Sequence, residues 1–378
     1  MKDYVRMHDS LPVLSSELFA HDWIADLKGG ASSISDLVEK GYLTEDDAAA
    51  LSTVTRQFKF RVGRYYLSLV DWDDPNCPIR KQAIPSVNEV DYSGSEMSDP
   101  IGDDTYRVNP LLIHRYPDRV LLTPTLNCPM YCRYCFRKVG LNNDRVQFTK
   151  HWADAVAYLQ AHPEIEEVIL SGGDPLLIGD QQLHRILSTL RDEVSIERIR
   201  IHSRVPVTLP HRITDGLMSV LAEFTPLVVV SHFNHPKEFT PLSTSRLAAL
   251  RQAGITLSNQ SVLLKGVNDN PDVLRALCTG LLNHGVIPHY LHHPDLTVGT
   301  DHLRVSLEEG RRIFSTLRGK TSGLAIPTYV MEIPDGGGKI VADGQGVQSL
   351  GHGRWSLFST RTNQWSTWTD PAHQVERL

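Results

Sequence analysis

Residues 119–135 read RVLLTPTLNCPMYCRYC, an apolar run that ends in three closely spaced cysteines. The apolar part predicts a buried β-strand, so Cys128, Cys132 and Cys135 stand on the loop at its carboxyl end. Three thiolates with the spacing CxxxCxxC can bind three irons of a [4Fe–4S] cluster and leave the fourth iron open for another ligand. A zinc site is the main alternative, although zinc usually binds a CxxC pair together with a distant second pair.

Short apolar runs alternate with amphipathic helical patterns from residue 119 onward. After the first interval the runs recur about every 30 residues, the length of one βα unit. This alternation predicts parallel strands joined by right-handed crossovers, and we expect an α/β fold with a partial (β/α)6 barrel. The predicted strands are 119–126, 167–170, 199–202, 227–232, 256–263 and 286–291, the predicted helices are 152–162, 181–193, 215–224, 245–253 and 271–284, and a further apolar run covers 326–333.

The rest of the chain differs in pattern from this alternating region. Residues 1–60 have helical periodicity, with helices expected at 35–41 and 44–54 and Thr44 at the start of the second. Residues 71–110 are rich in Asp, Pro, Asn and Ser, which predicts an irregular segment. We therefore divide the chain into a mostly helical region with a linker (1–110), a barrel (111–320) and a C-terminal segment (321–378).

Composition limits the classes of function. The chain has 378 residues, a net charge of −6 and five cysteines. The odd number of cysteines does not suit a disulfide framework and indicates thiols in a reducing compartment. The negative charge argues against nucleic acid or an anionic membrane as a partner, and no apolar run reaches the length of a membrane span. We expect a cytoplasmic protein.

Two glycine-containing segments follow predicted strands. In SGGDP, residues 171–175, the glycines let the backbone approach a ligand closely, although the same residues also make an ordinary turn. PDGGGK ends in Lys339, and a lysine held in a pocket can lose its proton and form a Schiff base with pyridoxal phosphate (PLP). Arg115 and Arg119 could bind the phosphate of that cofactor. Residue chemistry alone favours a solvated lysine on a mobile turn.

Ten segments between residues 60 and 345 resemble the lysine 2,3-aminomutase family, whose members are radical S-adenosylmethionine (SAM) enzymes that also bind PLP. Among these segments are HRYPDRVLL, CPMYCRYCFRK, SGGDPLL, RIRIHSRVPV, SHFNHP, HHPDLTVGTDH and PDGGGK. The resemblance implies a radical SAM barrel with a C-terminal PLP-lysine segment. It also implies an isomerase that moves the α-amino group of an amino acid to the β-carbon and gives a β-amino acid.

The resemblance implies a role for each matching position. The three cysteines hold the cluster, and Lys339 is the catalytic lysine that binds PLP. A tyrosine that the family has near PLP is expected here as His292 or His293. The other matching residues are Tyr134, Gly172, Gly173, Asp174, Arg204, His232 and Gln260 for SAM, Arg115 and Arg119 for the PLP phosphate, and Arg137, Asp295 and Glu332 for the substrate.

Two carboxylates at the far end of the substrate site suit a cationic side chain, so the resemblance favours L-lysine and then arginine. Ordinary roles are the alternative, with Asp295 as a helix cap and Glu332 as a solvated charge. Glu332 stands where the lysine enzymes have Asp, which leaves lysine or arginine open. Further expectations are a homo-oligomer and an external one-electron reductant of the flavodoxin or ferredoxin type. The competing functions are a lysine aminomutase linked to elongation-factor modification and a zinc-stabilised binding module.

Overall fold

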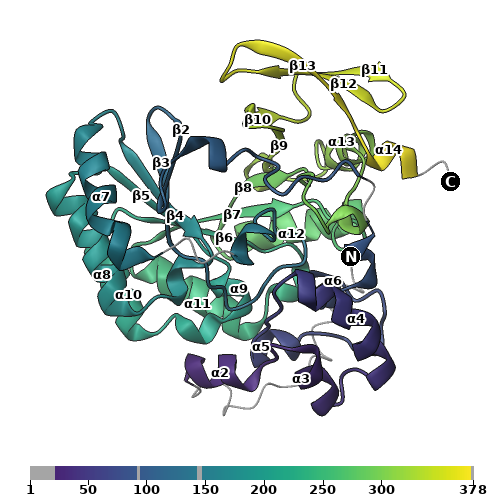
Figure 1. Cartoon of the computed structure of the whole chain (residues 1–378), viewed down its shortest axis with the longest axis horizontal. Helices are drawn as coiled ribbons and strands as arrows, with labels where there is room; N and C mark the ends of the chain where they lie inside the picture. Colours follow the sequence, from purple (N-terminus) through teal and green to yellow (C-terminus); the bar gives the residue numbers. More distant parts are fainter. Residues whose placement is uncertain (1–21, 92–93, 143–146, 376–378) are drawn as a thin grey trace.

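A curved ten-stranded sheet, in which the strands follow one another in chain order, forms the centre of the molecule (Figure 1). The computed structural model describes residues 22–91, 94–142 and 147–375, so the first part of the predicted helical region 1–60 lies outside the described residues. Seven neighbouring strands are parallel, and they are β3 Arg119–Thr125, β4 Glu167–Gly172, β5 Arg198–His202, β6 Val228–Ser231, β7 Thr256–Val262, β8 Ile287–His292 and β9 Thr328–Ile333.

The six predicted strands are confirmed as β3 to β8, and the sheet continues beyond them. The run at 326–333 becomes β9, which pairs in parallel with β8. Antiparallel strands complete both edges, with β1 Arg107–Asn109 and β2 Leu112–Tyr116 beside β3, and β10 Gly338–Val341 beside β9. Because β9 and β10 extend the same sheet, the lysine segment is built onto the barrel. The domain boundaries at 110 and 320 stay a prediction.

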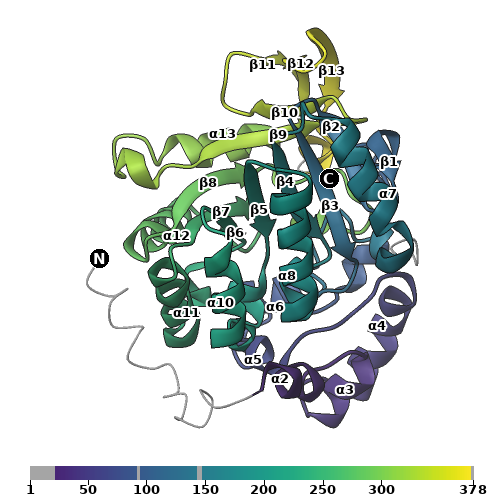
Figure 2. The ribbon, with the colours of Figure 1, turned by 90° about the vertical axis from the view of Figure 1, so that its left-hand side faces the viewer.

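Helices cover the outer face of the parallel strands, as Figure 2 shows for α8, α10 and α11. Their apolar faces meet strand residues such as Leu170, Ile201 and Val229, which are fully buried. This pattern is expected of parallel strands that alternate with crossover helices. The helices are α7 Phe148–Ala161, α8 Asp180–Ser188, α10 Asp215–Glu223, α11 Pro241–Gln252, α12 Pro271–Asn283 and α13 Leu307–Ser315, with the short α9 Val205–Thr208 after β5.

The N-terminal region is helical where the structure describes it, and it lies at one end of the barrel (Figure 1). Thr44 caps α4 through its hydroxyl and the backbone N–H of Asp47, which confirms the predicted helix start. The predicted irregular segment contains only short elements, including a 3-10 turn at Val87–Val90. The helices of this region are α2 Trp23–Gly29, α3 Ile34–Glu39, α4 Glu45–Gln57, α5 Arg64–Leu67 and α6 Pro78–Ala83.

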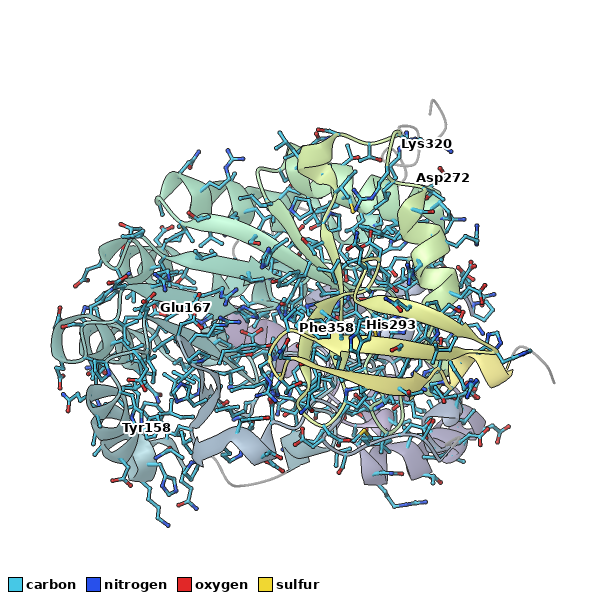
Figure 3. The ribbon with its side chains drawn as sticks, turned by 90° about the horizontal axis from the view of Figure 1, so that it is seen from above. Tyr158, Glu167, Asp272, His293, Lys320 and Phe358 are labelled. Atoms are coloured by element: carbon cyan, nitrogen blue, oxygen red, sulfur yellow. The ribbon has the colours of Figure 1, made fainter. Side chains whose placement is uncertain are left out.

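A second, antiparallel sheet of three strands follows β10, and the sequence analysis did not predict it. Its strands are β11 Val347–Gly351, β12 Arg354–Ser359 and β13 Gln364–Thr369, with α14 Ala372–Val375 after them. Seen from above, this sheet lies across the barrel near His293 (Figure 3), and the Trp368 ring lies 6.2 Å from the ring of His293. The Asp370 carboxylate also accepts the Leu307 backbone N–H at 2.6 Å. The Trp368 contact attaches the tail to the segment after β8, and the Asp370 hydrogen bond attaches it to the start of α13.

Candidate functional site

The cysteine loop, residues 128–138, follows the carboxyl end of β3. Cys128, Cys132 and Cys135 are free thiols and half-buried, and the Cys135 N–H donates to the Cys132 carbonyl oxygen at 3.2 Å. Burial, and then the neighbouring Cys132, raise the pKa of Cys135 to about 11. Within the described residues, no group of three or more His, Cys, Asp or Glu side chains converges on one metal ion. A cubane fits such a loop, since each thiolate bonds a different iron.

A buried carboxylate from the N-terminal region anchors the cysteine loop. Glu89 accepts hydrogen bonds from Arg133 Nε at 2.9 Å and from Lys138 Nζ at 2.6 Å, and all three side chains are at most 4% exposed. Burial alone would raise the pKa of Glu89, but Arg133 and then Lys138 lower it below its usual value. Lys138 also donates to the Gly299 carbonyl oxygen at 2.9 Å. The sequence analysis missed Glu89, although the capping box with Ser86 marks a local turn there.

A second buried ion pair touches the loop from the opposite side. Arg204 follows β5 and donates from Nη1 to Cys132 Sγ at 3.0 Å. Its Nη2 atom donates to Glu238 Oε1 at 2.8 Å and to Gln82 Oε1 at 2.6 Å. The resemblance expects Arg204 near SAM, and the structure places its guanidinium against the sulfur of a predicted cluster ligand.

The SGGD segment at the end of β4 packs tightly against β3 and the residues just before the cysteine loop. Gly172 has a φ of +103°, and a Cβ there would come within 2.3 Å of Thr123, while a Cβ on Gly173 would come within 2.4 Å of the Asn127 carbonyl oxygen. Both positions therefore require glycine for packing alone. The Asp174 carboxylate accepts hydrogen bonds from the backbone at the start of α9 and from nearby groups, and the donors are Leu176 N, Ser203 Oγ, Arg204 N and Val205 N.

The remaining residues predicted near SAM lie around the ends of β6 and β7. Gln260 Nε2 and His232 Nε2 are 2.9 Å apart. Burial lowers the pKa of His232 to about 3, and Arg204 and Arg137 lower it as well, so the imidazole is neutral at physiological pH. The Tyr134 hydroxyl accepts a hydrogen bond from Asn234 Nδ2 at 2.6 Å. Together with the cysteine loop, these side chains form one end of the site.

Lys339 occupies the other end of the site, as the second residue of β10 in the hairpin that β10 forms with β9. It pairs directly with Glu332 across the two strands, and its Nζ lies 3.5 Å from Glu332 Oε1 and 4.7 Å from the centre of the Tyr290 ring. The Lys339 side chain is 26% exposed, so it is not the solvated lysine of a mobile turn. Burial lowers its pKa, and the nearby Glu332 and Asp295 limit that decrease. The sequence analysis expected His292 or His293 as the aromatic neighbour and missed Tyr290.

Asp103 joins two arginines with different predicted roles. Its carboxylate accepts hydrogen bonds from Arg115 Nη2 at 2.8 Å and from Arg137 Nη2 at 2.9 Å. Arg115 Nη1 also lies 3.5 Å from Glu332 Oε2, so this ion pair connects β2 to β9 across the curved sheet. A cavity of about 240 Å³ adjoins the Asp103–Arg137 ion pair, and Asp103, Arg137 and Gly172 contribute to its wall. The cavity therefore connects the Asp103–Arg137 ion pair to the SGGD segment.

Arg119 contacts its neighbours in the chain, Asp118 and Tyr116. It pairs with Asp118 at 2.6 Å, and its guanidinium lies 4.0 Å from the centre of the Tyr116 ring. The Tyr116 hydroxyl accepts the backbone N–H of Lys339 at 3.1 Å. Arg119 is thus linked to the lysine hairpin through Tyr116.

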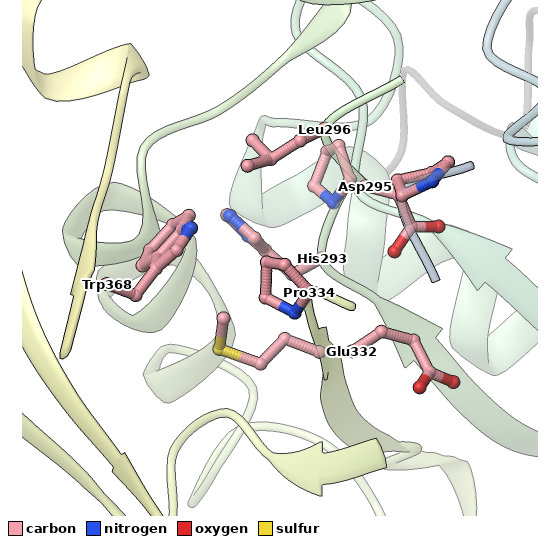
Figure 4. A pocket seen from close by; sticks show the side chains of 9 residues that line it. His293, Asp295, Leu296, Glu332, Pro334 and Trp368 are labelled. Carbon is pink, nitrogen blue, oxygen red and sulfur yellow. The ribbon is translucent and has the colours of Figure 1, made fainter. Parts of the chain in front are cut away.

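Asp295 follows β8 and Glu332 lies on the adjacent β9, and both carboxylates are near Lys339. Figure 4 shows both carboxylates pointing to the same side, away from His293 and Trp368. Burial raises the pKa of Asp295 to about 7, and Glu332 adds to the increase. A small cavity of about 10 Å³ touches both acids and has room for about one water. The interpretation of Glu332 as a solvated charge is wrong, because its side chain is 11% exposed.

A parallel barrel sheet with a CxxxCxxC loop after its first parallel strand defines the class as radical SAM protein, and residues 122–277 match the model of the Radical SAM superfamily. Residues 314–356 match the model described as Lysine-2,3-aminomutase. The chain is 40% identical over 321 residues to the L-lysine 2,3-aminomutase of Clostridium subterminale. The aligned region covers 84% of this chain and 77% of that protein. The chain belongs to the lysine 2,3-aminomutase family.

Relatives with different substrates are similarly close to this chain. The L-lysine 2,3-aminomutase of Methanococcus maripaludis is 42% identical over 299 residues, covering 79% of this chain and 69% of that protein. The glutamate 2,3-aminomutase of Clostridioides difficile is 36% identical over 298 residues, and the aligned region covers 79% of this chain and 70% of that protein. Family membership therefore identifies a radical SAM aminomutase, an isomerase whose class implies a [4Fe–4S] cluster and SAM, and leaves the amino acid open. Among the described residues, no helix is long and apolar enough to cross a bilayer.

The hydrogen bonds of Asp174 predict a large structural effect. Asp174→Ala removes an acceptor from two backbone N–H groups at the start of α9, and we expect a loss of about 2–4 kcal/mol in the free energy of unfolding. Asp174→Asn keeps one acceptor oxygen and should lose about half as much. Urea unfolding of the cluster-free chain measures both values. Wild-type stability in both variants would mean that this carboxylate does not hold the segments after β4 and β5 together.

Proposed function

We propose that this aminomutase acts on a basic α-amino acid, L-lysine in the first place and arginine in the second. The observation that carries the proposal is the acid pair Asp295 and Glu332 beyond Lys339. Burial and mutual repulsion raise the pKa of Asp295 to about 7, so a cationic side chain would stabilise its ionised form. A glutamate side chain would instead bring a third carboxylate to this place, which costs free energy.

Arg137 is proposed to bind the substrate carboxylate. Its guanidinium holds Asp103 in the described structure, so a carboxylate ligand would replace one anion by another on the same fork. The substrate would then extend from Arg137 toward the acid pair and place its α-amino group near Lys339. Arg115 pairs with both Asp103 and Glu332, so its single positive charge offsets part of their negative charge in the absence of a ligand.

Lys339 is proposed to hold PLP, with Arg115 and Arg119 toward its phosphate. Buried polar atoms without a hydrogen-bond partner among the described residues support the fit, because Arg115 Nε, His202 Nε2 and His292 Nε2 have none. The charge of Lys339 contributes to the lowered pKa of both histidines, which places them near the lysine. When bound, the cluster and SAM supply hydrogen-atom abstraction at the β-carbon, and PLP carries the migrating amino group.

The residues of this chain position those groups and exclude water. Lys339 presents an amine whose pKa burial lowers, as a nucleophilic lysine requires. Neutral His232 and Gln260 lie beside the cysteine loop, where we propose contacts with SAM together with Tyr134, Gly172 and Gly173. Within this proposal the protein is cytoplasmic and homo-oligomeric, and a flavodoxin or ferredoxin type of protein reduces the cluster.

Cluster ligation by the cysteine loop has a direct test. Cys132→Ala should lose the brown colour and most of the about four irons per chain that a [4Fe–4S] cluster contains. Cys278→Ala is the matched control, since Cys278 is buried in α12 and should leave the iron content unchanged. Iron, sulfide and the visible spectrum are measured after anaerobic reconstitution. A normal cluster in Cys132→Ala would exclude Cys132 as a ligand.

The lysine assignment has a test that depends on pH. The neutral amine is the form that bonds PLP, and the negative charge of Glu332 raises the pKa of Lys339. Glu332→Gln should therefore move the pH midpoint of PLP capture to lower pH, read from the visible absorbance of the bound cofactor. Lys339→Ala should abolish this absorbance, while Lys320→Ala at an exposed position should keep it. A midpoint that moves upward in Glu332→Gln would contradict the proposed contact.

Substrate class is tested by anaerobic turnover of lysine, arginine and glutamate with SAM, PLP and a reductant. We expect lysine or arginine to be converted and glutamate not. Asp295→Asn should lower kcat/KM for the basic substrate about 10- to 100-fold, mainly through KM, as expected for the loss of a charged hydrogen bond. Asp370→Asn is the control, because this buried carboxylate belongs to the tail. Turnover of glutamate, or equal effects of both variants, would refute the acid pair as the specificity site.

A further inference from the structure

Arg204 is buried and uses each nitrogen of its guanidinium. Its Nε atom donates to the His232 carbonyl oxygen at 3.2 Å, Nη1 donates to Cys132 Sγ at 3.0 Å, and Nη2 donates to Glu238, Gln82 and Tyr66. The residue is 5% exposed. The partners come from the N-terminal helices, the cysteine loop and the segment after β6. These hydrogen bonds hold the positive charge of Arg204 at one position.

Glu238 is the counter-ion of this charge and is equally well held. Its side chain is fully buried, and Oε1 also accepts the Tyr66 hydroxyl at 2.7 Å. Its Oε2 atom accepts the backbone N–H groups of Asn234 and His235 at 2.6 Å and 3.0 Å. These hydrogen bonds fix the position of the Glu238 carboxylate independently of Arg204. A buried ion pair of this kind keeps both charges at defined distances from the cysteine sulfur.

The hydrogen bond to the sulfur gives the pair a chemical consequence. Hydrogen bonds to the sulfurs of an iron–sulfur cluster and nearby charges set its reduction potential. Reduction adds one negative charge to the cluster, so a cation at Cys132 stabilises the reduced state and a carboxylate beside it opposes this effect. An arginine keeps its charge at every physiological pH. Its effect on the potential is thus constant with pH.

We infer that Arg204 is a positioning residue that donates to the Cys132 thiolate and, balanced by Glu238, sets the reduction potential of the cluster. The inference rests on the proposed ligation by the cysteine loop. It goes beyond a role in SAM binding, because it holds for the cluster in the absence of SAM.

The test compares cluster potentials in reconstituted full-length variants without SAM. Arg204→Gln removes the cation and should lower the midpoint potential, so that at a fixed applied potential the ratio of reduced to oxidised cluster falls about tenfold, which is about 59 mV for a one-electron couple. Glu238→Gln removes the anion and should shift the potential in the opposite direction. Arg204→Lys keeps the charge and should lie between Arg204→Gln and the wild type. Arg212→Gln, at a buried arginine that binds Ile178 and Asp180, should not change it.

Opposite signs separate this inference from a purely structural role, because both substitutions weaken the same hydrogen-bond network. Shifts of equal sign, or an unchanged potential in Arg204→Gln with a full complement of iron, would overturn the inference. Loss of the cluster from all three variants of Arg204 and Glu238, while Arg212→Gln keeps it, would reduce the network to a support for the loop and likewise overturn it. A wild-type chain that forms no cluster would instead refute the ligation proposal on which the inference rests.

Discussion

Two buried carboxylates, Glu89 and Glu238, hold the cysteine loop in place. Glu89 binds Arg133 and Lys138 within the loop, and Glu238 binds Arg204, which in turn reaches Cys132. Charges this deeply buried are stable only when they are paired, so the loop cannot move without exposing them. The anchoring acids come from the N-terminal region and from the segment after β6. A loop of eleven residues, 128–138, thereby acquires a fixed conformation.

The opposite end of the site, around Lys339, also depends on paired charges, but these charges are less deeply buried. Lys339, Arg115 and Arg137 share two carboxylates, Asp103 and Glu332, at distances of 2.8–3.5 Å. Asp103 and Arg137 border the larger cavity and Glu332 borders the smaller one, so their partners can be exchanged for those of a ligand. Paired charges therefore define both ends of the site. One end keeps its ion pairs to position sulfur atoms, and the other can exchange them for an amino acid with its own charges.

Much of the fold could be predicted from the periodicity of the sequence, whereas the contacts within the site could be predicted only in part. Strands β3 to β8 and the start of α4 at Thr44 were predictable because local patterns and caps decide them. The parallel pairing of β9 with β8 was not predicted, since an apolar run does not reveal its partner strand. Glu89 and Tyr290 were missed because an acid in a turn and a tyrosine in a strand have no distinctive local signal. Both matter through contacts with residues far away in the chain.

The sequence by itself determined the chemistry that this protein carries: three cysteines on one loop, a lysine after three glycines and alternating strands and helices. These features are local, and local backbone preferences and spacing decide them. Only the tertiary structure decided which charges meet. It placed Arg204 on Cys132, Asp103 between Arg115 and Arg137, and Glu332 beside Lys339. The physical reason is that an ion pair depends on distance and burial in space, which the curved sheet creates between residues far apart in the sequence.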